Sequence, residues 1–184
     1  MVTPAKPAVG GGVMSGPLTA TLPTAADSTA TGFTSLGYIS DAGVTRSIQK
    51  DTTVVKAWGG AVVMILDNGK TETFKFVMLN GTDPNVLKLV NGDGNVTGSS
   101  LATGISAKSG SGLDPGHKFV IDMIESENTL HRICIPQGVV TNIGDVVYVD
   151  NAAVGYEVTL TAIADSAGFT CYEYWKTAAS AAAS

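Results

Sequence analysis

The chain has 184 residues, enough for one domain with appended segments. Only 15 % of the residues are charged, whereas about 25 % is usual in a soluble domain, and 44 % are apolar. The net charge of −5 argues against a protein that grips nucleic acid, since such proteins are normally basic. We expect no membrane segment, because no run approaches about 20 apolar residues, and no signal peptide, because the stretch after Lys6 has no continuous apolar core. The shortage of charge instead predicts a surface covered by other copies of the chain.

Low-complexity segments are expected at both ends. Residues 1–32 are rich in Pro, Gly, Ala and Thr without helical or strand periodicity, which predicts a flexible N-terminal arm. Residues 177–184 form a similar C-terminal tail. The sequence therefore predicts one folded domain over residues 33–176, with ends that are disordered in a free subunit and able to order against a neighbour.

Strands are predicted to open the folded domain. Residues 44–56 alternate in places, and Gly59-Gly60 weakens the strand locally, which suggests a bulge or a close backbone approach. Residues 61–66 continue it, and Asn68-Gly69 predicts a type I′ hairpin turn, the strongest turn signal in the chain. Residues 71–79 then return as a strand. One face of that strand is expected to carry Glu72, Phe74, Phe76 and Met78.

A single helix is predicted next, followed by more hairpins. Asp83 is a good N-cap, Pro84 suits the first turn and Gly92 can end the helix. Residues 117–126 are expected to pair with 128–136, and residues 144–150 with 155–165. The last predicted strand covers residues 168–176. Seven to nine strands with one helix predict a mainly β fold, an antiparallel β-sandwich or half-barrel with one flanking α-helix.

Motifs of catalysis and cofactor binding are missing from the sequence. His117 and His131 stand in no metal-binding or triad spacing, and no phosphate-binding or nucleophile motif occurs. We therefore expect no enzyme, no cofactor and no metal. Cys134 and Cys171 lie in predicted strands, and two buried free thiols and a disulfide both remain open.

Several ordered blocks of the sequence resemble one family. LGYISDAGVTRSIQKDTTVVKAWGGAVVMIL, TETFKFVML and DPNVLKLVNGDGNVTG are followed by FVIDMIESENTLHRICIPQGVVTNIGDVVYVDNAAVGYEVTLTA. Together these blocks resemble the major tail tube proteins of long-tailed phages with non-contractile tails, and those infecting actinobacteria are the nearest match. The resemblance covers about residues 36–176. It does not extend to the two ends or to the loop at residues 99–116.

The resemblance implies a fold shared with the type VI secretion tube and a structural role in the virion. Family members form homohexameric rings whose inner sheet edges pair, and the rings stack into a hollow tube. The implied partners are other copies of the chain, a tape-measure protein, tail terminator and tail-tip or baseplate proteins, and double-stranded DNA in transit. Assembly in the host bacterial cytoplasm is also implied.

Two sets of contact residues follow from the resemblance and from the sequence pattern. In the family, the region between the first strands reaches toward the adjacent ring, and here it would be residues 47–60. The candidate contacts are Ser47, Gln49, Asp51, Lys56, Trp58, Gly59 and Gly60. Trp58 is the preferred anchor, because glycines beside a large ring allow close approach. The alternative is that Trp58 belongs to the core of its own subunit.

Polar strand faces are candidates for the wall of the lumen. A neutral or acidic wall would hold passing DNA less strongly than a basic one. The candidates are Asp122, Glu125, Glu157, Thr159 and Thr161. The alternatives are an outer-surface position and an Asp122–Arg132 pair across a hairpin.

Other functions are compatible with the same fold. A capsid decoration or tail-tip module would form caps or rings but no long tubes. A type VI-like secreted tube protein has a similar fold, although the sequence blocks resemble phage proteins more closely.

Overall fold

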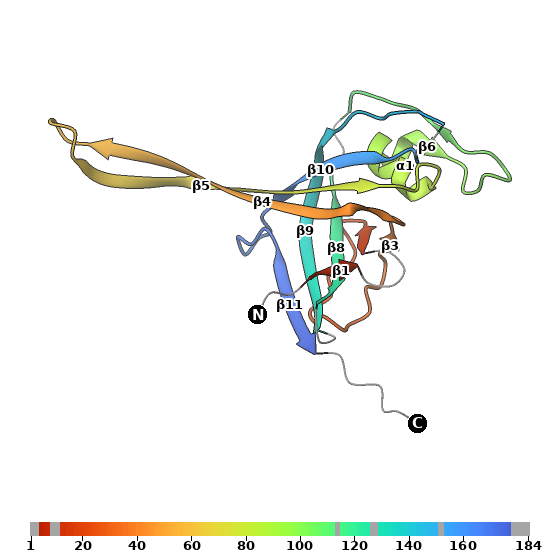
Figure 1. Ribbon diagram of the computed structural model, residues 1–184, viewed down its shortest axis with the longest axis horizontal. Helices are drawn as coiled ribbons and strands as arrows, with labels where there is room; N and C mark the ends of the chain where they lie inside the picture. Colours follow the sequence, from red (N-terminus) through yellow and green to blue (C-terminus); the bar gives the residue numbers. More distant parts are fainter. Residues whose placement is uncertain (1–3, 8–11, 113–114, 126–128, 151–152, 178–184) are drawn as a thin grey trace.

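The computed structural model describes residues 4–7, 12–112, 115–125, 129–150 and 153–177. Within these residues the chain forms two sheets, one α-helix and one short 3₁₀ turn (Figure 1). In chain order the elements are β1 (Lys6–Pro7), β2 (Val13–Gly16), β3 (Thr34–Ser35), β4 (Ile39–Lys56), β5 (Val62–Met78), α1 (Pro84–Asn91), the 3₁₀ turn Asp93–Asn95, β6 (Val96–Thr97), β7 (Ser106–Ala107), β8 (His117–Ile124), β9 (Thr129–Ile143), β10 (Tyr156–Ile163) and β11 (Tyr172–Thr177).

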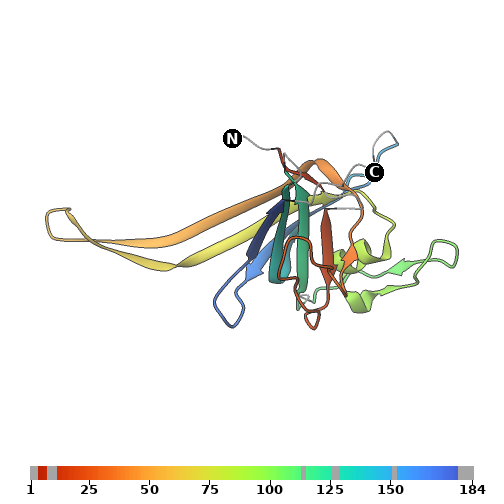
Figure 2. The ribbon, with the colours of Figure 1, turned by 90° about the horizontal axis from the view of Figure 1, so that it is seen from below.

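Strand β9 holds the main sheet together, because it is shared by two groups of strands. The sheet order is β3-β2-β8-β9-β10-β5-β4, with β1 added to β8 and β11 added to β9. One edge of β9 pairs with β11 up to Cys134 and with β10 from Gln137 onward. Pro136 lies between the two pairings. Because proline has no backbone N–H, it cannot donate a hydrogen bond to a neighbouring strand, and β9 changes its partner at this position. The β10-β5-β4 group therefore crosses over β8, β9 and β11 (Figures 1 and 2).

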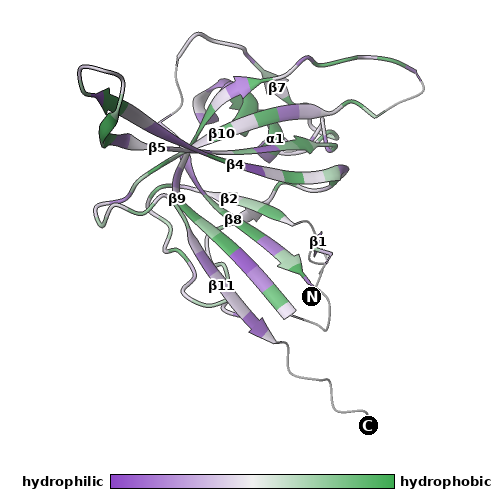
Figure 3. Ribbon diagram, turned by 60° about the vertical axis from the view of Figure 1, so that its left-hand side comes forward, coloured by the Kyte–Doolittle hydropathy of each residue, from purple (hydrophilic) through white to green (hydrophobic). Residues whose placement is uncertain are grey.

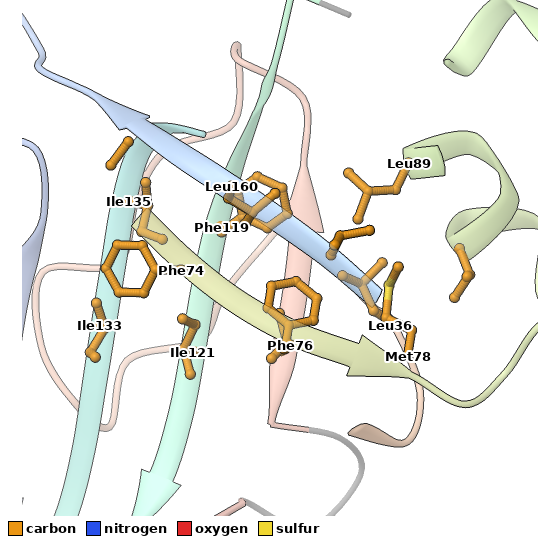
Figure 4. Packing of buried hydrophobic residues seen from close by; sticks show 14 residues of the cluster. Leu36, Phe74, Phe76, Met78, Leu89, Phe119, Ile121, Ile133, Ile135 and Leu160 are labelled. Carbon is orange, nitrogen blue, oxygen red and sulfur yellow. The ribbon is translucent and has the colours of Figure 1, made fainter. Parts of the chain in front are cut away.

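The hydrophobic core fills the space between the crossing groups of strands. Phe74 and Phe76 of β5 pack in one cluster with Ile121 of β8 and Ile133 of β9, whereas Met78 lies beside Leu36 toward the end that helix α1 closes with Leu89 (Figure 4). The predicted face of β5 is confirmed, since Glu72 is also buried. The expected mainly antiparallel β fold with one flanking α-helix is thus confirmed in the described part of the chain.

The predicted helix is also confirmed, with both of its caps. The Asp83 carboxylate accepts a hydrogen bond from the backbone N–H of Asn85 at 2.8 Å, and Pro84 is the first helical residue. Gly92 ends the helix with φ +91° and donates its N–H to the Lys88 carbonyl at 2.7 Å. These local capping rules act within one segment of the chain, which is why sequence alone was sufficient to predict them.

The predicted turn at Asn68-Gly69 is wrong, because β4 and β5 turn at residues 57–61. The Ala57 N–H donates to the Ala61 carbonyl at 2.8 Å, and the Gly60 N–H donates to the Ala57 carbonyl at 2.9 Å. Gly59 and Gly60 have φ +109° and +90°, which residues with a Cβ rarely adopt. The predicted bulge at these glycines is therefore the tip of an unusually long hairpin.

Asn68 instead forms the bulge. Asp51 is paired with Gly69 and Thr52 with Asp67, so Asn68 has no residue opposite it. The Asn68 amide donates to the Thr53 hydroxyl at 2.7 Å, and the Gly69 N–H donates to the Asp67 carboxylate at 2.9 Å. A type I′ turn requires residues with positive φ, which is why Asn68-Gly69 suggested a turn. Gly69 does have a positive φ (+125°), but it lies at a bulge within a continuous strand.

The second predicted hairpin is only half right. Residues 155–165 contain β10, but residues 144–150 form no strand, and β10 pairs with β5 and with the end of β9. The ladder stops at Gly144, whose N–H donates to the Glu157 carbonyl at 2.8 Å. The β8–β9 hairpin is confirmed, with Asp122 opposite Arg132. The predicted last strand is confirmed only from residue 172 onward, as β11, because residues 168–171 form no strand.

The prediction that residues 1–32 are a flexible arm needs correction for its described part. Strand β2 lies inside the sheet between β3 and β8, and Val13 is fully buried. Residues 20–28 lie over the outer face of β8 and β9, where Arg132 binds their carbonyls. Arg132 Nη1 donates to the Ala25 carbonyl at 3.0 Å and to the Ser28 carbonyl at 2.5 Å. This segment shows no apolar periodicity of its own. It is held in place by hydrogen-bond donors on β9, a strand that is distant in the sequence. Residues 1–3 and 8–11 lie outside the described residues, as do residues 178–184 of the predicted tail.

Replacing Arg132 with Met is expected to detach this N-terminal segment. Arg132 also binds Asp122 through two bonds, at 2.6 and 2.8 Å, and the hydrogen bonds to Asp122 raise the pKa of the guanidinium. Removing one partner of a buried pair typically costs about 3 kcal/mol. Hydrogen–deuterium exchange should show faster exchange over residues 20–28. Lys176→Met removes only an exposed pair with Asp27 and serves as the control; equal exchange in both variants would contradict the anchoring role.

Both cysteines are free thiols, which resolves the open alternative. Cys134 is buried, and burial raises its pKa to about 12. Cys171 is half-buried, and burial, which outweighs the nearby Arg46 charge, raises its pKa to about 11. Neither thiol forms an appreciable amount of thiolate at neutral pH. Because the thiolate is the nucleophilic form, both cysteines are unreactive.

Candidate assembly interface

The outer part of the β4–β5 hairpin projects away from the body of the molecule (Figures 1 and 2). Every residue from Ser47 to Thr71 is exposed, and we call this segment the projecting hairpin. With about 3.3 Å per strand residue, residues 47–56 reach roughly 30 Å from the body. A two-stranded ribbon of this length is marginally stable in water on its own. Its length therefore indicates that it packs against something else.

Apolar residues are concentrated at the outer end of the projecting hairpin (Figure 3). Several of them are consecutive in the strand, and successive side chains of a strand point to opposite faces, so both faces of this end are apolar. Trp58 at the tip is fully exposed, with a relative accessibility of 107 %. The other exposed apolar side chains of this end are Val54, Val55, Val62, Val63, Met64, Ile65 and Leu66. A contiguous exposed apolar surface of this kind marks an interaction site.

Two sheet edges are also open in the described part of the chain. Strand β4 pairs with β5 alone, so its other edge is free along its length. The pairing of β8 with β9 ends at Gly138, so β9 has no partner on that edge from Val139 to Ile143. The group formed by the end of β9 with β10, β5 and β4 can therefore accept a strand on either side.

A buried carboxylate anchors the base of the projecting hairpin. Glu72 is fully buried and accepts hydrogen bonds from Arg46 at 2.5 Å, Lys70 at 3.0 Å, Thr170 at 2.5 Å and the Cys171 thiol at 3.4 Å. Burial alone raises the pKa of Glu72, but these hydrogen bonds outweigh it and lower the pKa to about 2. The carboxylate thus ties β4 and β5 to the segment that leads into β11.

The same network continues to β9. Arg46 also donates to Glu173 at 2.6 Å, and His131 lies between Glu173 and Glu125, at 3.2 and 2.9 Å. The His131 ring stacks on Trp175 with 4.5 Å between ring centres. These ion pairs and hydrogen bonds connect the base of the projecting hairpin to β9 and β11. They therefore fix the direction in which the hairpin leaves the body of the molecule.

One polar face runs across β10, β5 and β4. Glu157, Thr159 and Thr161 lie on this face, opposite to the buried Val158 and Leu160. The neighbouring strands add Thr73, Lys75, Thr45 and Ser47 in register. Lys75 binds Glu157 at 3.0 Å, and the Thr141 and Thr161 hydroxyls are 2.9 Å apart. Hydroxyl groups dominate this face, and two of its charges neutralise each other.

Residues 5–183 match the sequence model of a family described as phage tail tube protein. The chain belongs to the phage tail tube protein family. The resemblance noted in the sequence is thereby confirmed, and the chain is a structural subunit of a phage tail tube. Among solved structures, it is similar to the tail of an empty GTA particle with C6 symmetry, with a TM-score of 0.39 and 10 % identity over 91 % of this chain and 94 % of the other. No curated protein matches the chain.

The inter-ring candidates of the tail tube subunit all lie on the projecting hairpin. Ser47, Gln49 and Asp51 alternate along the exposed part of β4, and Lys56 lies at its end. Trp58, Gly59 and Gly60 form the tip. The alternative that Trp58 is a core residue of its own subunit is wrong, because the side chain is fully exposed.

The lumen candidates of the tail tube subunit do not come together at one place. Glu157, Thr159 and Thr161 share the polar face, whereas Asp122 and Glu125 belong to the β8–β9 hairpin. Asp122 is paired with Arg132, as the alternative interpretation had it, and Glu125 binds His131. These two carboxylates therefore serve contacts within the subunit.

Sequence reasoning missed the Glu72 network. The available signal was a carboxylate in line with Phe74, Phe76 and Met78, on a face predicted to be apolar. Such a residue needs partners when buried. In the described residues of the tail tube subunit, no group of three or more acidic, His or Cys side chains is placed to hold a metal ion. The one described α-helix is too short to cross a membrane.

Proposed function

We propose that this subunit is the major tail tube protein of a siphovirus-type phage and that it forms homohexameric rings stacked into a hollow tube. The observation that carries the proposal is the projecting hairpin, which exposes an apolar surface that the monomer leaves uncovered. The ring number of six rests on the family resemblance.

Ring closure in this proposal uses the open edges of β4 and β9. Joining them between neighbours would satisfy backbone groups that otherwise need water. The projecting hairpin then contacts the adjacent ring through Ser47, Gln49, Asp51, Lys56 and the tip. Assembly occurs in the host cytoplasm around a tape-measure protein, with terminator and tail-tip proteins at the ends. The subunit contributes no catalytic step.

The polar face of β10, β5 and β4 is the proposed wall of the lumen. Its hydroxyl groups and its Lys75–Glu157 pair offer DNA few unpaired cations. Phosphates passing such a wall would release few counterions and would be held weakly.

Adding positive charge to this face is expected to slow DNA passage without preventing assembly. Phages carrying Thr159→Lys and Thr161→Lys together should form tails of normal length, because both side chains point away from the core. DNA release triggered in vitro should slow several-fold at low salt and recover at high salt, where phosphate contacts are screened. The control is Thr159→Gln with Thr161→Gln, which adds bulk without charge. An unchanged salt dependence would exclude this face from the lumen.

The assembly proposal itself is tested by negative-stain electron microscopy over a concentration series, with and without tail-tip components. Hollow tubes with a regular axial repeat and sixfold end views are expected. Rings that never stack would favour a tail-tip or decoration module. A strictly monomeric protein under both conditions would overturn the proposal.

A further inference from the structure

An apolar cavity opens between strand β1, the start of β4 and strand β8. Its volume is about 220 Å³. Pro7, Val13, Ile39, Val44, Ile121 and Met123 supply most of its apolar lining. An apolar cavity of about 150 Å³ accepts benzene, whereas sites for drug-sized molecules measure roughly 300 Å³ or more. The cavity therefore has the size of one large aromatic side chain.

A single polar atom distinguishes this cavity from a packing defect. Ser40 is one of its lining residues, and its hydroxyl oxygen is buried without a hydrogen-bond partner among the described residues. A buried polar group without a partner is costly, and such groups are rare in folded proteins. Asp122 and Asp41 also line the cavity, but Arg132 binds both carboxylate oxygens of Asp122, and Asp41 is exposed to solvent. Among the described residues that line the cavity, the Ser40 hydroxyl is thus the side-chain oxygen that is buried without a partner.

Trp58 has the complementary chemistry. Its indole is a large apolar ring with one N–H that donates and cannot accept. Trp58 stands at the tip of the projecting hairpin with its whole side chain exposed, whereas Trp175 is stacked on His131. An exposed tryptophan at the tip of the projecting hairpin can insert into a pocket on another molecule.

The cavity cannot take the Trp58 of its own chain. Val44 lines the cavity and belongs to the same strand that leads outward to the tip. With about 3.3 Å per residue, Val44 and Trp58 are separated by roughly 40 Å or more. The tip and the cavity therefore meet only between two copies of the chain.

We propose that the Trp58 indole of one subunit inserts into this cavity of another subunit and donates its N–H to Ser40 Oγ. The inference rests on the proposed assembly and identifies a donor and a receptor residue for it. Tip and cavity are different surfaces of one chain, so the contact is heterologous. A heterologous contact generates rings or open stacks and does not stop at a dimer.

Variants of the two residues test the contact by the concentration at which tubes form. Trp58→Phe keeps a ring and loses the N–H, and Ser40→Ala loses the acceptor. Each change should raise the assembly concentration about fivefold, as the loss of one hydrogen bond predicts. The double variant should be no worse than the worse single variant, because both remove the same bond. Fully additive effects would overturn the pairing.

Filling the cavity gives an independent test that a folding defect cannot imitate. In Ser40→Leu, the new side chain occupies the space meant for the indole and removes the unpartnered hydroxyl. The monomer should therefore unfold at the same temperature as wild type or higher, while tube formation is lost. Normal tubes from Ser40→Leu would exclude the cavity as the receptor.

Proximity is tested with cysteines that leave both residues in place. Ala57→Cys and Asp41→Cys subunits, mixed before assembly, should be joined by a short bifunctional thiol reagent in tubes and not in monomers. Leu101→Cys, on an exposed loop, replaces Asp41→Cys as the matched control. Tubes without this cross-link would overturn the inference and leave the proposed function intact. Absence of tubes from wild-type protein would instead count against the proposed function.

Discussion

A subunit without the outer part of the projecting hairpin is expected to fold normally and to form no tubes. The variant joins Asp51 to Gly69 through a new Asn-Gly pair that replaces residues 52–68. Asp51 and Gly69 are cross-strand partners, so a two-residue type I′ turn closes the hairpin there. Every removed residue is exposed in the monomer, and the unfolding temperature should therefore change by only a few degrees.

Assembly should respond very differently, because the deletion removes Trp58 and the apolar surface around it. Electron microscopy and sedimentation should show monomers at concentrations at least a hundredfold above those at which wild type assembles. A matched control shortens the exposed loop at residues 99–103 and should assemble normally. Tubes formed by the truncated subunit would show that the projecting hairpin is dispensable and would remove the main support for the assembly proposal.

Replacing Glu72 with Gln is expected to give a large loss of subunit stability. The folded pKa of Glu72 is about 2, below its ordinary value of 4.5. At 1.36 kcal/mol per pKa unit, the charged form contributes about 3 kcal/mol. For a chain of this size the loss corresponds to a fall of roughly 10 °C in unfolding temperature. Glu157→Gln, which breaks a partly exposed pair with Lys75, should cost less than about 1 kcal/mol.

The effect of Glu72 should also depend on pH in a defined direction. Because the folded pKa is lowered, the contribution is fully present above pH 4.5 and is lost as the pH falls toward 2. Denaturant titrations should show wild type and Glu72→Gln converging over that range. A constant difference between the two proteins at all pH values would contradict the role of the charged form.

Elements whose determinants lie within one segment could be predicted from sequence. Helix α1 carries its own caps at Asp83 and Gly92. The apolar face of β5 follows from simple alternation, and the β8–β9 hairpin from two adjacent apolar runs. The family was recognisable from ordered sequence blocks alone. These predictions needed no knowledge of distant contacts.

The position of the hairpin tip could not be predicted in this way. Two glycine-containing segments, at residues 59–60 and 68–69, suit positive φ equally well. Which of the two segments forms the turn depends on the pairing of β4 with β5 near the core. Phe74 is buried in the core, and Arg46 is its partner on β4. Counting outward from that pair puts the turn at residues 57–61. Likewise, the N-terminal segment is held by Arg132, more than 100 residues away in the chain.

The shared strand β9 also determines how the subunit carries mechanical load. A neighbour that pulls on the projecting hairpin pulls along the axis of β5, which is held by seven residue pairs to β10. Force parallel to a strand loads all bonds of its ladder at once, whereas force across it would open them one after another. Strand β10 passes the load to β9, and β9 spreads it to β8 and β11. Tension on a tail would therefore be distributed over the whole sheet of each subunit.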